Sequence, residues 1–114
     1  MDEFTKGYMT CALWAAIDDN GNPYDKKFSI TDFSLQSKIQ IEEECNQFQA
    51  RAAAELEKAY ERGYTKEQAG HDFCLTRNGH GAGFWSRDEL EEGELGCQLS
   101  KIAEKFGEAY VFLF

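Results

Sequence analysis

The residues of this 114-residue chain that are best suited to chemistry lie in one stretch, HDFCLTRNGHGAGFWSR, from His71 to Arg87. Histidines can exchange a proton near neutral pH, and arginines can bind an anion through their guanidinium groups. The glycines between them would let a ligand approach the backbone closely. One interpretation is therefore a small-ligand or nucleotide site, or an active site, made of His71, Arg77, His80 and Arg87.

The same stretch lacks the signatures of common catalytic and phosphate-binding loops. The segment NGHGAG has no Lys-Ser/Thr pair, and the residues after it resemble a strand rather than the helix that follows a phosphate-binding loop. Spacing alone identifies no Ser-His-Asp or Cys-His arrangement. We therefore favour a structural hairpin whose histidines and arginines decorate the turn or pair with carboxylates. On that interpretation we expect a binding protein without a cofactor rather than an enzyme.

Alternating side chains support the hairpin. The segment DFCLTR places Phe73, Leu75 and Arg77 on one face of a strand. Asn78–Gly83 has the glycines of a tight turn, which predicts that residues 82–87 form the return strand. The C-terminal segment EAYVFLF is short and rich in β-forming residues, so it predicts a further strand.

Apolar residues at helical spacing predict three helices beside this sheet: 3–17, a long helix from Ser34 to Gly63, and 95–106. Ser34 is suited to cap the long helix, and Gly63 is suited to end it.

Thr65, with Gln68 three residues later, predicts a capping box that opens a single helical turn, and Gly70 is expected to close that turn. The expected fold is a single α+β domain over residues 1–114. It consists of a small antiparallel sheet (hairpin plus C-terminal strand) packed against three helices, one of them long.

The chain is strongly acidic, with 21 Asp and Glu against 12 Lys and Arg and a formal net charge of -9. Such a chain is repelled by phosphate backbones, so we expect no direct binding to nucleic acid. Rows of carboxylates suit a partner with a basic surface, although they also occur as ordinary solvated helix faces. The predicted partner-binding residues are Glu42, Glu43, Asp88, Glu89, Glu91, Glu92 and Glu94.

The cysteines Cys11, Cys45, Cys74 and Cys97 lie far apart and form no CxxC or Cys/His cluster, which argues against a zinc site. Each has apolar neighbours, which is typical of a reduced thiol in a protein core. The N-terminus lacks the pattern of a signal peptide, and no apolar run approaches the length of a membrane span. We therefore expect a protein of the reducing cytoplasm of a host cell, away from membranes.

The segment from Asp72 to Arg87 resembles a motif of small uncharacterised proteins encoded by bacteriophages and mobile elements, DFWLTRNGHGAGFWDR. This chain matches the motif in order except at Cys74, where the motif has Trp, and at Ser86, where it has Asp. The resemblance extends thinly across most of the chain. It implies a phage setting, and small acidic phage proteins often bind and disable host machinery.

The function expected from these observations is that of a small acidic phage-type accessory protein. It would bind a host protein with a basic surface, such as a nucleic-acid-handling enzyme or a defence complex, as anti-restriction and anti-CRISPR proteins do. Inhibition would follow from occlusion of that basic surface. The alternatives are the ligand site in the glycine-rich stretch and a structural role in assembly.

Overall fold

The computed structural model describes residues 2–15, 33–79 and 82–107, and all regular structure within them is helical. The five α-helices of this part are α1 (Glu3–Ala15), α2 (Leu35–Arg51), α3 (Ala53–Glu61), α4 (Lys66–Arg77) and α5 (Leu95–Glu104). Three 3₁₀ turns, η3 (Phe84–Ser86), η4 (Asp88–Leu90) and η5 (Glu92–Glu94), connect α4 to α5. None of the described helices is long and apolar enough to cross a membrane.

The predicted α+β fold is wrong, because the described residues contain no strand. The segment 72–77, expected as the first arm of a hairpin, is the second half of α4, and residues 84–86 of the expected return strand form a 3₁₀ turn. The predicted C-terminal strand, 108–114, lies outside the described residues, as do His80 and Gly81 at the centre of the predicted turn.

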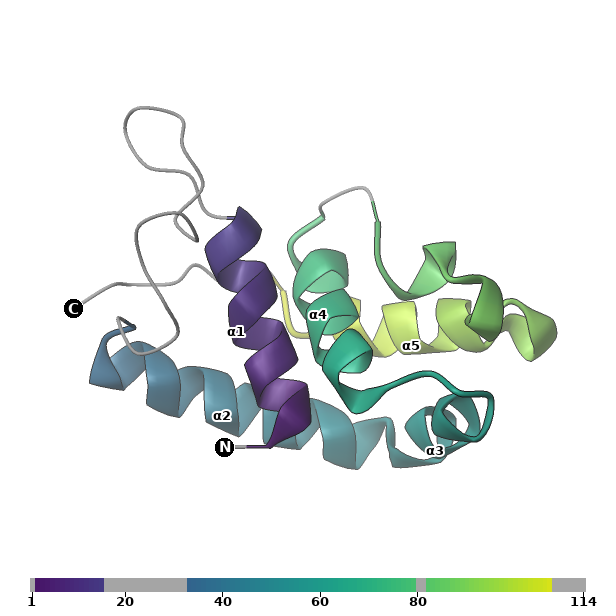
Figure 1. Cartoon of the computed structure of the whole chain (residues 1–114), viewed down its shortest axis with the longest axis horizontal. Helices are drawn as coiled ribbons and strands as arrows, with labels where there is room; N and C mark the ends of the chain where they lie inside the picture. Colours follow the sequence, from purple (N-terminus) through teal and green to yellow (C-terminus); the bar gives the residue numbers. More distant parts are fainter. Residues whose placement is uncertain (1, 16–32, 80–81, 108–114) are drawn as a thin grey trace.

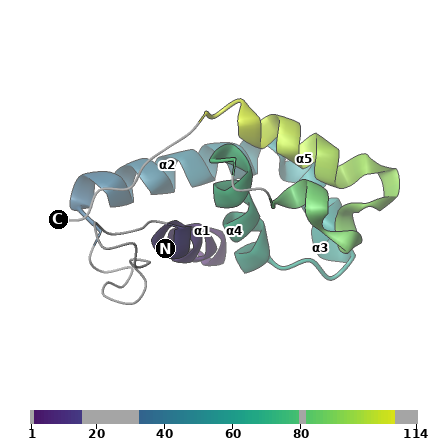
Figure 2. The same cartoon turned by 90° about the horizontal axis from the view of Figure 1, so that it is seen from above.

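The hairpin prediction is wrong because of where α4 lies in the fold. Figures 1 and 2 show α4 in the middle of the molecule, with α1 on one side and α5 on the other. Every residue from Asp72 to Arg77 is buried, so this part of the helix has no polar face and no helical period in its hydrophobicity. Without that period, the β-type alternation of the segment DFCLTR was the stronger signal.

Two glycines allow α1 and α4 to cross with their backbones in contact. A Cβ atom built on Gly7 would lie 2.0 Å from the carbonyl oxygen of Glu67, and one on Gly70 would lie 1.8 Å from that of Phe4. No larger residue fits at either position without moving a helix. Gly70, predicted to end a single turn, instead lies inside α4 at this crossing.

The predicted helix ends are confirmed where they rest on local hydrogen bonds. The Oγ of Ser34 accepts a hydrogen bond from the backbone N–H of Ser37 at 3.1 Å, and the Oγ1 of Thr65 accepts one from that of Gln68 at 3.0 Å. Gly63 adopts a left-handed φ of +93° after α3. The predicted long helix, however, is divided at Ala52, where φ is -103° and ψ is 17°.

Stacked phenylalanine rings fill the space between the helices. Phe48 of α2 stacks on Phe73 of α4 with centroids 4.3 Å apart, and it stacks on Phe84 of η3 at 5.7 Å. Phe4 of α1 lies against both Phe48 and Phe73. All four side chains are fully buried, and each contributes about 2–3 kcal/mol to stability by leaving water.

The helix crossing gives a test of the fold. Gly7→Ala improves helix propensity, yet we expect it to lower the free energy of unfolding by roughly 3 kcal/mol, because the added methyl group collides with backbone that cannot yield. Lys6→Ala, at an exposed position of the same helix, is the control and should change stability by less than about 0.5 kcal/mol. Urea unfolding measures both, and an unchanged Gly7→Ala variant would show that the helices do not touch here.

Candidate functional site

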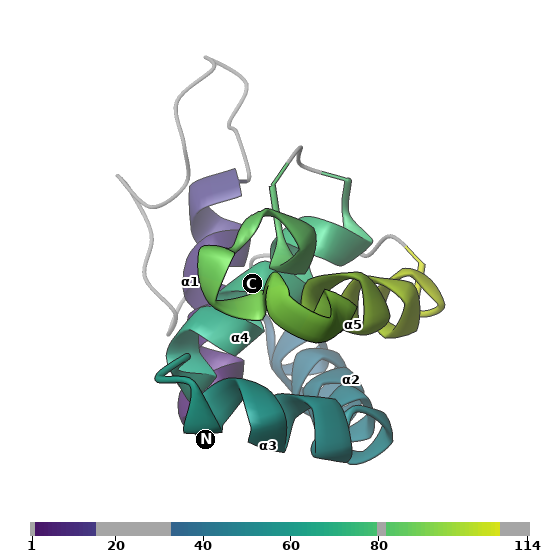
Figure 3. The same cartoon turned by 90° about the vertical axis from the view of Figure 1, so that its right-hand side faces the viewer.

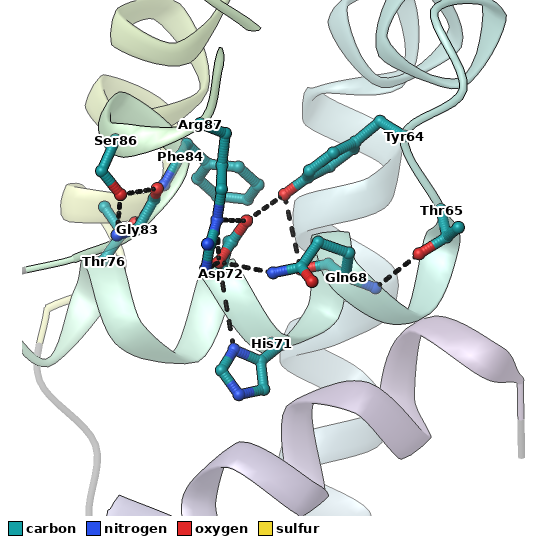
Figure 4. A network of polar contacts seen from close by, with 10 residues as sticks. All are labelled: Tyr64, Thr65, Gln68, His71, Asp72, Thr76, Gly83, Phe84, Ser86 and Arg87. Atoms are coloured by element: carbon teal, nitrogen blue, oxygen red, sulfur yellow. Dashed lines mark hydrogen bonds and ion pairs between the residues drawn. The ribbon is translucent and has the colours of Figure 1, made fainter. Parts of the chain in front are cut away.

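Three residues of the predicted ligand site lie on or next to α4, but the structure gives the two arginines among them structural partners. His71 and Arg77 belong to α4, Arg87 follows η3, and His80 lies outside the described residues. Figure 4 shows Arg87 directed at the buried carboxylate of Asp72.

Asp72 is the centre of this network and has no exposed surface. Arg87 donates to it from Nη2 at 2.6 Å and from Nε at 2.9 and 3.1 Å to its two carboxylate oxygens. Gln68 donates from its side-chain amide at 3.1 Å, and the Tyr64 hydroxyl donates a short hydrogen bond to the same carboxylate. The Nδ1 of His71 lies 3.9 Å from the nearer Asp72 oxygen. The carboxylate is thus compensated by one full charge and several donors.

This environment keeps Asp72 ionised. Burial by itself would raise the pKa of Asp72, but the interactions with His71, Arg87 and Tyr64 outweigh burial, so its pKa lies below the ordinary value. Burial, followed by the negative charge of Asp72, raises the pKa of Tyr64. The tyrosine hydroxyl therefore stays protonated and remains a donor rather than a candidate acid or base near neutral pH.

Arg77 is held by a different set of groups. Its Nη1 and Nη2 donate to the two carboxylate oxygens of Glu44 at 3.1 and 3.3 Å, and Nη1 also donates to the Tyr8 hydroxyl at 3.3 Å. Nη2 and Nε donate to the carbonyl oxygens of Phe106 and Gly107, which follow α5. Only 1% of the Arg77 side chain is exposed, so it ties α1, α2 and the end of α5 to α4.

The segment before Arg87 is fixed by a compact set of hydrogen bonds. Ser86 Oγ accepts from the backbone N–H of Gly83 at 3.1 Å and donates to its carbonyl at 2.9 Å. Thr76, on α4, accepts a hydrogen bond through its Oγ1 from the backbone N–H of Phe84 at 3.2 Å. Ser86, a departure from the phage motif, therefore makes a local turn contact that places η3 and Arg87.

Both arginines are therefore committed to carboxylates of the chain, and they share no partner. His71 also lies near Asp72, and it borders an open hollow of about 210 Å³ between α1 and the start of α4. Gly7, Thr10, Thr65, Glu67 and Gln68 line the rest of that hollow. The structure thus does not bring His71, Arg77 and Arg87 together as one anion site. Instead, the groups in Figure 4 hold α4 to its neighbours.

The predicted partner-binding carboxylates form two separate groups. Asp88, Glu89, Glu91, Glu92 and Glu94, which we call the acidic row, are all exposed on η4, η5 and the links beside them. Glu43 is exposed and Glu42 half-buried on α2. The molecule is 41 Å long, and η4 and η5 lie near α3 at one end of its long axis, away from the start of α2 (Figures 1 and 3).

Arg62 anchors the backbone of the acidic row. Its Nη1 donates to the carbonyl oxygens of Glu89 and Glu92 at 3.1 and 2.9 Å, not to their carboxylates. Within the described part of the chain, no carboxylate of the acidic row forms an ion pair. The backbone of the row is therefore held in place while its negative charges face solvent.

No disulfide links the cysteines, and the described residues contain no group of three side chains that could hold a metal ion. Cys11, Cys45 and Cys74 are buried, whereas Cys97 is exposed. A hydrogen bond with Cys74, followed by burial, raises the pKa of Cys11, and burial raises that of Cys45. The thiols of Cys11 and Cys45 are therefore poor nucleophiles and poor metal ligands, because both roles require the thiolate.

Reasoning from the sequence missed Tyr64 and Gln68 as partners of Asp72, and Glu44 as the partner of Arg77. Tyr64, Gln68 and Asp72 are spaced four residues apart, the spacing of neighbours on one helix face. That signal was present, but it has meaning only if residues 66–77 are helical. Nothing in the sequence pairs Glu44 with Arg77, because α2 and α4 approach each other through tertiary packing alone.

The buried carboxylate leads to a prediction about stability and pH. Asp72→Asn leaves Arg87 without its anion and should lower the free energy of unfolding by roughly 3 kcal/mol at pH 7, near the low end for buried pairs because Arg87 is 31% exposed. Folding lowers the pKa of Asp72, so its contribution is full above about pH 4 and is lost as the pH falls through the folded-state value. The difference between wild type and variant should therefore shrink in acid.

Urea unfolding of both proteins from pH 7 to pH 3 measures this difference. Glu67→Gln, at an exposed position of the same helix, is the control and should match wild type at pH 7. A constant gap across the pH range would mean that the Asp72 charge is not what stabilises the fold.

The cysteines give a second prediction. In the native protein a thiol reagent should modify Cys97 rapidly and the three buried cysteines only after unfolding, because the reagent must reach a thiolate. Cys97→Ser should remove the fast phase. Fewer than four reactive thiols in denaturant without reductant would reveal a disulfide and contradict the prediction of four reduced cysteines.

Comparison with known proteins does not assign the chain to a family. No protein-family model, curated protein or solved structure matches the chain. The resemblance to phage-encoded proteins therefore stays a prediction from the motif, and the function has to be argued from the residues themselves.

Proposed function

We propose that this chain is a small acidic accessory protein, of the type that bacteriophages encode, which binds a basic surface of a host protein and inhibits it by occlusion. The observation that carries the proposal is the acidic row, whose five exposed carboxylates lie on a backbone held by Arg62. Suitable partners are nucleic-acid-handling enzymes and defence complexes, because their working surfaces are basic grooves.

The energetics of the acidic row favour a binding role over simple solubility. Like charges so close together repel one another, and Glu94 adopts a left-handed φ of 58°, which costs about 1–3 kcal/mol for a residue other than glycine. The fold offsets this cost by burying Leu90 and Leu95 within and beside the row. Charges scattered over helix faces would keep the protein soluble without such strain. A basic partner would relieve the repulsion.

Glu42 and Glu43 do not extend the acidic row, because they lie on α2, whereas the row lies on η4, η5 and the links beside them. We therefore assign binding to the acidic row and treat Glu42 and Glu43 as a separate acidic patch. The ligand-site alternative has less support, since Asp72 and Glu44 already occupy the guanidinium groups of Arg87 and Arg77.

The test is an affinity purification from bacterial lysate at several salt concentrations, followed by an activity assay of the captured protein. Asp88→Lys with Glu89→Lys should slow association with that protein about tenfold at low salt, because steering by opposite charge raises association rates. Glu42→Lys with Glu43→Lys makes the same change in net charge and is the matched control. It should slow association much less.

Two results would contradict the proposal. Equal effects of the two double variants would mean that net charge, not the acidic row, governs binding. A captured protein whose binding is insensitive to salt and lost in His71→Ala or His80→Ala would move the functional site to the glycine-rich stretch.

A further inference from the structure

Trp85 is an exposed aromatic residue that directly follows a fully buried one in the turn η3. The preceding residue, Phe84, is fully buried in the phenylalanine stack, whereas 54% of Trp85 is exposed. Among the described residues, the other large apolar side chains with this exposure are Leu35 and Ile39, on α2. Tryptophan is among the residues that contribute most at protein interfaces. An exposed indole next to a charged row therefore calls for a functional explanation.

The backbone beneath Trp85 is held on both sides. The N–H of Phe84 donates to Thr76 of α4, as described above, and the Cα of Trp85 lies close to α5. A Cβ atom on Gly96 would lie 3.2 Å from that Cα and 2.6 Å from the carbonyl oxygen of Phe84. The turn is therefore hydrogen-bonded to α4 and packed closely against α5. A partner would meet an indole whose backbone is already ordered, which lowers the entropic cost of binding.

The acidic row begins three residues after Trp85. Three residues of chain span at most about 11 Å, so the backbone of the exposed Trp85 lies no farther than that from the backbone of the exposed Asp88. The intervening Arg87 forms its ion pair with Asp72 and not with a carboxylate of the row. The surface thus combines an aromatic face with several anions.

An arginine elsewhere in the molecule combines the same two kinds of contact, with an aromatic ring and with a carboxylate. The guanidinium of Arg77 lies 5.2 Å from the ring centroid of Phe73 while it donates to both carboxylate oxygens of Glu44. Arginine can satisfy both needs because its planar group stacks on a ring and forms paired hydrogen bonds with a carboxylate, whereas the lysine ammonium forms only point contacts.

We infer that Trp85 and the adjoining acidic row form a docking surface for a protein segment rich in arginine rather than lysine. This inference rests on the proposed function. The carboxylates attract any basic partner, and Trp85 selects for arginine by stacking on its guanidinium. The row thus supplies the charge on which the proposed function rests, and the indole supplies the specificity.

The experiment measures binding of fluorescein-labelled nona-arginine and nona-lysine peptides to the full chain by anisotropy at fixed ionic strength. We expect the arginine peptide to bind about three- to tenfold more tightly, the range of one or two stacking contacts. Trp85→Leu, which keeps an apolar side chain, should remove this preference and leave lysine-peptide binding unchanged. Trp85→Phe should retain part of the preference, and circular dichroism confirms that each variant folds.

A variant with Asp88→Asn, Glu89→Gln, Glu91→Gln and Glu92→Gln separates this inference from the proposed function. It should weaken binding of both peptides, and no effect on either would overturn the proposed function. Equal affinity of the wild type for both peptides, or a preference that survives in Trp85→Leu, would overturn only the role of Trp85. Sedimentation that shows a dimer lost in Trp85→Leu would assign the surface to a second copy of the chain and also overturn it.

Discussion

The buried carboxylate of Asp72 is the interaction on which much of this structure depends. A charge without solvent contact is strongly destabilising unless it is paired and hydrogen-bonded. Asp72 lies in the middle of α4, and its donors are Gln68 of the same helix, Tyr64 before the helix and Arg87 after η3. The chain on either side of α4 must therefore return to it. This requirement places Arg87, and with it the beginning of the acidic row.

The other side of α4 meets the same kind of requirement with Arg77. This arginine is almost fully buried, and it is satisfied by Glu44, by Tyr8 and by the two carbonyl oxygens that follow α5. Between the two polar sites, the phenylalanine stack and the close crossing of α1 and α4 exclude water. The core is thus apolar in its middle and bounded by two arginine–carboxylate pairs, each of which joins segments far apart in the sequence.

The molecule has two kinds of carboxylate: some are paired with arginines inside the fold, and others are exposed. The carboxylates of Asp72 and Glu44 are neutralised by arginines, whereas those of the acidic row are exposed and held by contacts to their backbone alone. A short segment with repelling charges and a left-handed residue would not keep one conformation in isolation. Arg62 and the buried leucines hold it in place, and Trp85 lies at its start.

The sequence by itself determined the features that depend on neighbours in the chain. The helix α1, the caps at Ser34 and Thr65 and the helix end at Gly63 follow from hydrogen bonds and backbone angles within a few residues. The exposure of the acidic row follows from the number of charges that no core could accept. These predictions were confirmed because no distant contact competes with them.

Only the tertiary structure decided the conformation and the role of residues 66–87. Burial on all sides removes the helical period from α4, so its sequence resembles a strand until its neighbours are known. Glycine is typical of a helix end, yet the approach of α1 makes Gly70 a contact in the interior of α4. Likewise, Arg77 and Arg87 have the chemistry of anion ligands, and only packing assigns them to Glu44 and Asp72. Each of these outcomes depends on contacts between segments distant in the chain, which local pattern does not encode.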